Sequence, residues 1–334
     1  MLTWSPGLFG RSLLRLADLT DEEMLSLIDL SVALKARRRA GIRGNLLQRR
    51  QVALIFEKSS TRTRNAASVA IRDEGGSAEY LTKNDIHLGA KESVKDTARV
   101  LGRMFDGILF RGFSQETVAT LSAFSGVPVW NGLTDNFHPT QILADLMTIR
   151  ENFGRLKGLK VAYVGDGRNN VANSLMIGCV KAGIHYVNCT PDELTPDPAL
   201  VKEAREIGAR NGVTVEVHSD PKTGVAGANV IYTDVWVSMG EEAQKETRMR
   251  LLRPYQVNMD LVRATGNMGG ELIFLHCLPA FHDFETAMTA ESGALEVTDE
   301  VFEASFSKVF DEAENRMHTI KALYVSALTD LAAL

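Results

Sequence analysis

The 334-residue sequence has few cysteines, no long apolar run and no large excess of charge of either sign. Its cysteines, Cys179, Cys189 and Cys277, are too few and too unevenly spaced for a disulfide framework, which favours a reducing compartment. No apolar run approaches the ~18 residues that span a bilayer, and the first residues show no signal-peptide pattern. We therefore expect a cytoplasmic protein without membrane partners.

The charges nearly balance, since 37 basic and 42 acidic side chains give a net charge of −5. General nucleic-acid binding usually needs a basic face, so this balance argues against a nucleic-acid partner. With 45% hydrophobic residues the chain can bury a large core, and its length favours two domains over one. The sequence contains no repeat of fixed period and no low-complexity tract.

Apolar segments typical of buried strands alternate with amphipathic segments typical of helices. Strands are expected at residues 51–56, 107–110, 127–130, 160–164, 185–188, 214–217, 230–233 and 272–275. Helices are expected at residues 21–40, 65–72, 94–104, 140–153, 171–182, 197–211 and 315–331. This alternation predicts an α/β fold with two domains, each a mostly parallel sheet flanked by helices.

A loop-like stretch at residues 152–158 indicates where the two domains join. We expect a first domain at residues 1–150, a second at 151–314, and a C-terminal helix at 315–334 that packs back on the first domain. The active site is expected in the cleft between the domains.

Residues 59–64, Ser-Ser-Thr-Arg-Thr-Arg, follow a predicted strand and precede a segment compatible with a helix. Backbone N–H groups at a helix start, the positive end of the helix dipole and Arg62 would converge there on one anion, and phosphate fits best. Taken alone, Ser60 is equally consistent with a simple helix cap, and Arg62 with a solvated first-turn residue.

Ligands of open parallel sheets bind beyond the carboxyl ends of the strands, and polar chemistry follows other predicted strands of this chain. In the first half these residues are Arg111 and the His-Pro-Thr-Gln stretch at 138–141. In the second half they lie at residues 165–170, 234–240 and 276–279. Cations and donors in one half, with an acid, amides, a hydroxyl and a thiol in the other, predict an anionic substrate and a zwitterionic or amine substrate.

At these positions the chain resembles a known family. Ser60-Thr61-Arg62-Thr63, Phe110-Arg111-Gly112 and His138-Pro139-Thr140-Gln141 are similar to the carbamoyl-phosphate motifs of the aspartate and ornithine carbamoyltransferases. Residues 234–240, Asp-Val-Trp-Val-Ser-Met-Gly, and 276–279, His-Cys-Leu-Pro, are similar to the ornithine-binding motifs of that family. The similarity covers nearly the whole chain, and its motifs follow the family order.

The resemblance implies transfer of the carbamoyl group from carbamoyl phosphate to the side-chain amine of L-ornithine, which gives L-citrulline and phosphate. It assigns carbamoyl phosphate binding to Ser60, Thr61, Arg62, Thr63, His87, Arg111, His138, Pro139, Thr140, Gln141, Cys277, Leu278 and Arg316. It assigns ornithine binding to Asn170, Asp234, Ser238 and Met239. The catalytic residues of these sets are Arg62, Arg111, His138 and Cys277.

The resemblance also implies direct transfer through a tetrahedral intermediate, without a covalent enzyme adduct, a cofactor or a metal. It implies a homo-oligomer, a trimer or an assembly of trimers, with active sites at subunit interfaces. His87 stands where the family commonly has a Gln that enters the adjacent subunit's site. We expect carbamoyl phosphate binding to survive this difference with some added pH dependence.

Simpler interpretations exist for single residues. Cys277 alone is typical of a buried small apolar residue, His138 of a turn, Asp234 of a helix cap, and Arg316 of a helix end. The amine is also open to alternatives. Aspartate would need extra cations for its second carboxylate, and putrescine gives Asp234 no evident use, so ornithine is favoured.

Two other classes of protein fit parts of the sequence. Residues 165–170 hold two of the three glycines of a dinucleotide-binding fingerprint, but Asn170 replaces the third and no acid ends the next strand. A noncatalytic metal-binding module would use His276, Cys277, His282 and Asp283. Their spacing matches no structural zinc pattern.

Overall fold

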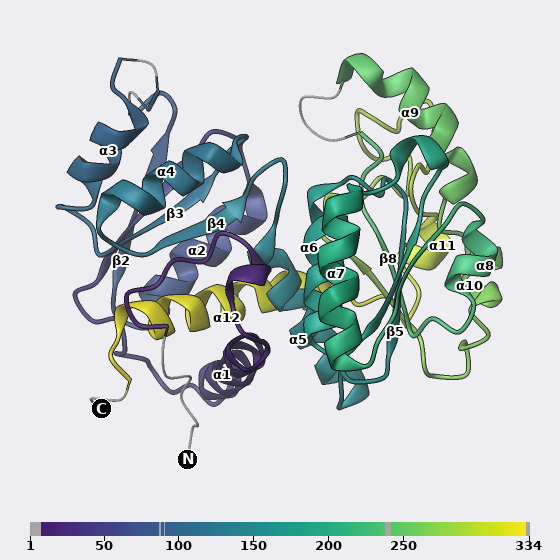
Figure 1. The fold of residues 1–334 in the computed structure, drawn as a ribbon, viewed down its shortest axis with the longest axis horizontal. Coiled ribbons are helices and arrows are strands. Elements are labelled where there is room, and N and C mark those ends of the chain that lie inside the picture. Colours follow the sequence, from purple (N-terminus) through teal and green to yellow (C-terminus); the bar gives the residue numbers. More distant parts are fainter. Residues whose placement is uncertain (1–7, 87, 90, 238–241, 332–334) are drawn as a thin grey trace. The chain divides into compact units, whose positions relative to one another are not determined.

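The computed structural model describes residues 8–86, 88–89, 91–237 and 242–331 (Figure 1). The chain divides into two compact units, one made of Met1–Met147 with Glu314–Leu334 and the other of Thr148–Ala313. Within the described residues, no helix is both long and apolar enough to cross a membrane.

The first unit is built on a parallel sheet with the strand order β2-β1-β3-β4. Its strands are β1 (Gln51–Phe56), β2 (Ser77–Thr82), β3 (Gly107–Arg111) and β4 (Val129–Leu133). Its helical elements are η1 (Leu16–Asp18), α1 (Asp21–Arg39), α2 (Thr61–Asp73), α3 (Val94–Leu101) and α4 (Gln115–Ser125), together with most of α5 (Pro139–Phe153) and of α12 (Val309–Leu328).

Helices cover both faces of this sheet, which explains why β3 is buried along its whole length. On one face, Ile55 and Phe110 pack with Leu101 of α3 and Leu121 of α4. On the other, the ring of Trp130 lies 4.8 Å from that of Tyr324 on α12. The yellow α12 therefore belongs to the layer opposite α3 and α4 (Figure 1).

The second unit contains a parallel sheet with the order β7-β6-β5-β8-β9. Its strands are β5 (Lys160–Val164), β6 (His185–Cys189), β7 (Val215–His218), β8 (Val230–Thr233) and β9 (Ile273–His276). Figure 1 shows α6 (Asn170–Lys181) and α7 (Pro198–Asn211) on one side of this sheet, and α8 (Pro221–Val225), α10 (Met259–Ala264) and α11 (Asp299–Phe302) on the other. The remaining helical elements are η2 (Asp192–Leu194), η3 (Glu242–Gln244), α9 (Lys245–Leu252) and η4 (Arg253–Tyr255).

In both sheets the strand order reverses beside the first strand of the unit. The chain passes from β1 to β2 on one side and then crosses to β3 on the other, and it likewise leaves β5 toward β6, β7 and later β8. Loops that leave neighbouring strands in opposite directions open a crevice at the carboxyl ends of those strands. The exits of β1, β3, β5 and β8 are therefore where each unit can take a ligand.

The structure confirms the α/β fold with two mostly parallel sheets flanked by helices. Three strands, β1, β5 and β8, begin and end at the expected residues. Sequence analysis missed β2, an edge strand whose side chains are only partly buried, because Ser77–Thr82 contains no apolar run. It also placed the start of α12 too late: the helix begins at Val309, in an acidic stretch that masked its pattern.

Candidate active site

The N-terminus of α2 lies directly after β1, as the polar stretch at residues 59–64 predicted. Ser60 is the N-cap residue, and its side chain accepts a hydrogen bond of 3.1 Å from the backbone N–H of Thr63. Thr61 is exposed, Arg62 is half-buried and Thr63 is buried. The cap interpretation of Ser60 is thus correct, and the same cap places Arg62 and Thr63 in the first turn of a helix whose dipole favours an anion.

Thr63 is the centre of a buried cluster that joins four segments of the first unit. Its hydroxyl oxygen accepts from Arg316 Nη2 of α12 at 3.1 Å and from Arg111 Nη1 at the end of β3 at 3.4 Å. Arg316 also donates to Thr140 Oγ1 at 3.4 Å and to Gln141 Oε1, both on the first turn of α5. Two guanidinium groups therefore converge on one buried hydroxyl, an arrangement suited to an anionic ligand.

His138 lies immediately before α5 and is 3% exposed. Its Nδ1 lies 3.5 Å from Thr140 Oγ1. Burial, with Arg316, Arg111 and Arg62 acting in the same direction, holds the pKa of His138 well below 6.5. The ring is therefore neutral near pH 7 and carries a single N–H. Pro139, which follows it, is the first residue of α5, where a missing N–H costs nothing.

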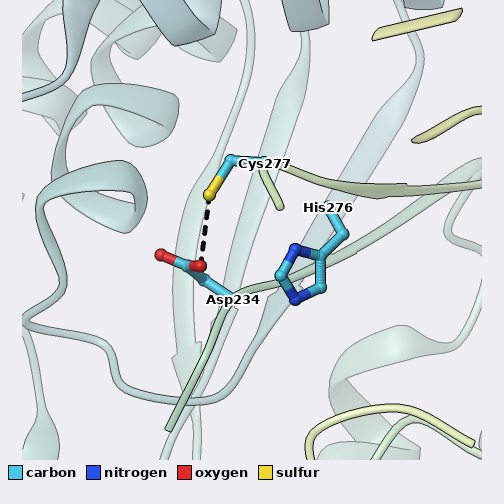
Figure 2. Close-up of side chains that lie close together, drawn as sticks. All are labelled: Asp234, His276 and Cys277. Carbon is cyan, nitrogen blue, oxygen red and sulfur yellow. Dashed lines mark hydrogen bonds between the residues drawn. The ribbon is translucent and has the colours of Figure 1, made fainter. Parts of the chain in front are cut away.

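In the second unit, Asp234 follows β8 and is 6% exposed. Its Oδ1 accepts from the Cys277 thiol at 3.1 Å and from the Val235 N–H at 2.8 Å, and its Oδ2 accepts from Asn169 Nδ2 at 3.0 Å. Figure 2 shows the Cys277 sulfur facing this carboxylate, with the His276 ring beside it. Burial raises the pKa of Asp234, although these donors oppose the shift.

His276 fixes the backbone that carries Cys277 and Leu278. Its Nδ1 accepts from the Leu278 N–H at 2.9 Å, so the proton of the neutral ring lies on Nε2, which faces Glu296 Oε1 at 3.2 Å. The His276 N–H donates to Glu312 at 3.0 Å. Leu278 has a φ of 58° and precedes a cis peptide bond to Pro279.

Among the expected ornithine-binding residues, Asn170 has a neighbour of the same type at the site, and others of the expected residues lie outside the described part. Asn170 is the first residue of α6, whereas its neighbour Asn169 caps that helix and reaches Asp234. His87, Ser238 and Met239 lie outside the described residues.

Sequence analysis missed Asp145, which is fully buried and accepts a hydrogen bond from Gln141 at 2.8 Å. Its spacing of one helical turn from Gln141 was the available signal.

The residues of the metal-module interpretation fall into two separate groups of potential ligands. One consists of Asp234, His276 and Cys277, and the other of His282, Asp283 and Asp299. In the first group both ring nitrogens of His276 already face Leu278 and Glu296, so the imidazole would have to give up one of these contacts to bind an ion. The four residues expected from sequence are therefore not one ligand set.

Gly167, one of the two glycines of the dinucleotide-like stretch, has a packing explanation. A Cβ at Gly167 would lie 2.7 Å from the Leu194 carbonyl oxygen and 2.8 Å from Asn188 Oδ1. Its N–H donates to Thr190 at 3.0 Å. Gly167 is thus required by the close approach of η2 to this loop, and a cofactor is not needed to explain it.

Comparisons with known proteins agree with these features. Residues 11–151 match the family described as "Aspartate/ornithine carbamoyltransferase, carbamoyl-P binding domain", and residues 157–327 match its "Asp/Orn binding domain". The chain is 56% identical to the "Ornithine carbamoyltransferase, catabolic" of Bacillus licheniformis, over 97% of this chain and 98% of the relative. It is 55% identical to the "Ornithine carbamoyltransferase" of Caldanaerobacter subterraneus, over 96% of this chain and 99% of the relative.

Among solved structures, the chain resembles the ornithine carbamoyltransferase from Pyrococcus furiosus. The TM-score is 0.90 at 43% sequence identity, and the likeness covers 97% of this chain and 99% of that one.

Proposed function

Because the chain belongs to the aspartate/ornithine carbamoyltransferase family, we propose that it transfers the carbamoyl group of carbamoyl phosphate to the side-chain amine of L-ornithine. The products are L-citrulline and phosphate. The observation that carries the proposal is the buried cluster of Thr63, Arg111, Gln141 and Arg316, which offers cationic donors and one amide to a ligand that is both anion and amide.

Carbamoyl phosphate carries about two negative charges near neutral pH, by analogy with other phosphate monoesters. In this proposal Ser60, Thr61, Arg62 and Thr63 hold the phosphate at the N-terminus of α2, and Arg111 and Arg316 complete its pocket. The convergence of Arg111 and Arg316 on Thr63 supports this assignment. Arg111 also reaches the carbonyl oxygen, so the same cation polarises the carbonyl and stabilises the departing phosphate.

Attack by the amine turns the carbonyl oxygen into an oxyanion. His138 and Thr63 donate hydrogen bonds to it, and each such fixed donor contributes ~3 kcal/mol in a closed site. The depressed pKa of His138 supports a role as neutral donor, because a neutral ring can hold the same N–H throughout the reaction.

The side-chain amine of ornithine has an intrinsic pKa of about 10.4, if it resembles lysine, so roughly one molecule in a thousand is neutral at pH 7. Nearby guanidinium groups favour this neutral form. Asp234, Asn170, Ser238 and Met239 bind the amino-acid end, while the Leu278 carbonyl accepts from the reacting amine. Cys277 directs its own proton at Asp234, which supports a positioning role and not an acylated nucleophile.

Two finer points rest on the relatives and the family. The relative from Bacillus licheniformis is named catabolic, which favours use of the reaction toward carbamoyl phosphate, although a catalyst accelerates both directions. The family resemblance favours a homotrimer or an assembly of trimers, which light scattering on the purified protein would measure directly. A monomer at working concentration would contradict the assembly and, with it, the expectation that active sites lie at subunit interfaces.

The amine is tested by offering L-ornithine, putrescine and L-aspartate separately with carbamoyl phosphate. We expect carbamoylated product, citrulline, with L-ornithine and much slower turnover with the other two. Equal or greater turnover with putrescine would replace the proposed substrate, and turnover with none of the three would end the proposal.

Arg62→Ala tests the phosphate site, and Arg64→Ala is its matched control two residues along the same helix. Arg64 is exposed and stacks over the Tyr80 ring at 3.7 Å, so it serves no proposed ligand. We expect Arg62→Ala to lower kcat/KM by at least ~100-fold, the effect of removing one fixed donor. Arg64→Ala should stay near wild type. Near-normal activity of Arg62→Ala would mean that the phosphate binds elsewhere.

A further inference from the structure

A buried carboxylate lies one turn of α5 beyond the amide proposed to hold the carbamoyl group. Gln141 is 1% exposed and Asp145 is 0% exposed. Gln141 Nε2 donates to Asp145 Oδ1 at 2.8 Å, and Gln141 Oε1 accepts from Arg316. No role assigned above uses Asp145.

The two neighbours determine which way the Gln141 amide faces. A guanidinium can only donate and a carboxylate can only accept, so Oε1 must face Arg316 and Nε2 must face Asp145. The opposite orientation would set N–H against N–H on one side and oxygen against oxygen on the other. Both contacts are buried, where mismatched polar groups are most costly.

Arg316 alone does not secure this orientation, because its guanidinium also donates to Thr63 and Thr140 and is proposed to bind phosphate. The carboxylate of Asp145 is on the same helix as Gln141, one turn away, and has no part in phosphate binding. Its contact with the Gln141 amide does not involve Arg316, so it can hold the amide while Arg316 binds other groups.

We propose that Asp145 is a positioning residue that turns the Gln141 oxygen toward the NH₂ group of carbamoyl phosphate. The site then selects a phosphate donor that carries an N–H group. The inference rests on the proposed function, since it takes Gln141 as the group that reads the carbamoyl amide. A carbonyl oxygen has two acceptor positions, one for Arg316 and one for the substrate. Acetyl phosphate has a methyl group in place of the NH₂ and leaves the second position unmatched.

The test measures binding of carbamoyl phosphate, acetyl phosphate and inorganic phosphate to the full-length protein by calorimetry. Asp145→Leu removes the acceptor at similar size, and Asp145→Asn keeps an acceptor but can turn over. We expect Asp145→Leu to reduce the preference for carbamoyl over acetyl phosphate by ~10-fold, the effect of one unmade buried hydrogen bond. Asp145→Asn should lose less, and inorganic phosphate should bind all variants about equally.

Leu146→Ala is the control, because Leu146 is also buried on α5 and its truncation destabilises the packing of the helix, while its apolar side chain has no hydrogen bond to offer Gln141. Its preference should equal that of wild type. In a Gln141→Leu background, Asp145→Asn should no longer change the preference, because the amide that it orients is gone.

The inference is overturned if Asp145 variants weaken all three ligands by the same factor, which would indicate a purely structural role. Should Asp145→Leu not fold, Asp145→Asn decides: an unchanged preference overturns the inference. Failure of the proposed function gives a different result, since wild type itself would then bind carbamoyl phosphate no better than inorganic phosphate.

Discussion

At the scale of single residues, the geometry at Cys277 distinguishes covalent catalysis by the thiol from direct transfer to the amine. A thiol that attacks a carbonyl must be a thiolate aligned with its electrophile. Here the thiol donates a hydrogen bond to the buried carboxylate of Asp234 at 3.1 Å, a contact that needs the hydrogen on the sulfur. The sulfur therefore fits a group that shapes the pocket for the amine.

Cys277→Ala is expected to lower kcat by about 10- to 100-fold, because one hydrogen-bonding and packing contact is lost. Cys277→Ser should recover part of that loss. Intact-protein mass spectrometry of wild type with carbamoyl phosphate should show no covalent adduct. A trapped adduct, or a loss near the million-fold typical of a removed nucleophile, would support covalent catalysis instead.

At the scale of elements, Arg248 on α9 holds together two loops of the candidate site. It pairs with Asp166 after β5, and its Nε donates to the Trp236 carbonyl oxygen after β8 at 2.7 Å. Arg248 is 2% exposed and Asp166 is 5% exposed. The Arg248 side chain thus links the loop that carries Asn169 to the loop that carries Asp234.

Arg248→Met should destabilise the protein by up to about 3–5 kcal/mol in urea unfolding, because it removes the buried guanidinium beside Asp166 and leaves that buried carboxylate with only the exposed Arg168 at 3.9 Å. Adding Asp166→Asn should restore much of the loss. Arg263→Met, which removes an exposed ion pair with Asp260, is the control and should change stability by less than about 1 kcal/mol. If the double variant were as unstable as Arg248→Met alone, the pair would not explain the effect.

Sequence revealed the elements with a strong local pattern and the residues at strand exits. The buried apolar runs of β1 and β5 were enough to predict these strands, and the polar stretch at residues 59–64 predicted the start of α2. What sequence could not supply was distant pairing. Arg248 and Asp166 are 82 positions apart, and nothing local indicates that they meet. Asn169 and Asn170 are identical in type, so only the geometry of the α6 cap distinguishes the one that reaches Asp234.

On the scale of the whole molecule, buried histidines make stability depend on pH. Burial, assisted by Lys321, lowers the pKa of His318 to about 4, although the hydrogen bond that its ring donates to Glu314 opposes this shift. The unfolded chain takes up this proton below pH 6.5 and the folded chain does not until about pH 4. Stability is therefore fully present above pH 6.5 and declines as pH falls.

The His318 contribution lost between pH 7 and pH 5 is about 2 kcal/mol, since 1.5 units separate pH 5 from the unfolded pKa. His318→Gln should reduce the acid-induced loss of unfolding free energy by this amount in urea titrations at the two pH values. His185→Gln, at a partly exposed position, serves as the control. An unchanged pH dependence in His318→Gln would contradict the shift.

The surroundings of His138 have a consequence for how the enzyme responds to acid. With three guanidinium groups beside an imidazole that stays uncharged, the local positive charge is the same in mildly acidic and in neutral solution. His138 then adds no pH dependence to the binding of the donor in that interval, which leaves His87 as the expected source of any such dependence on the protein's side. A fall in turnover at acid pH would otherwise originate in the reactants, through protonation of the phosphate or of the amine.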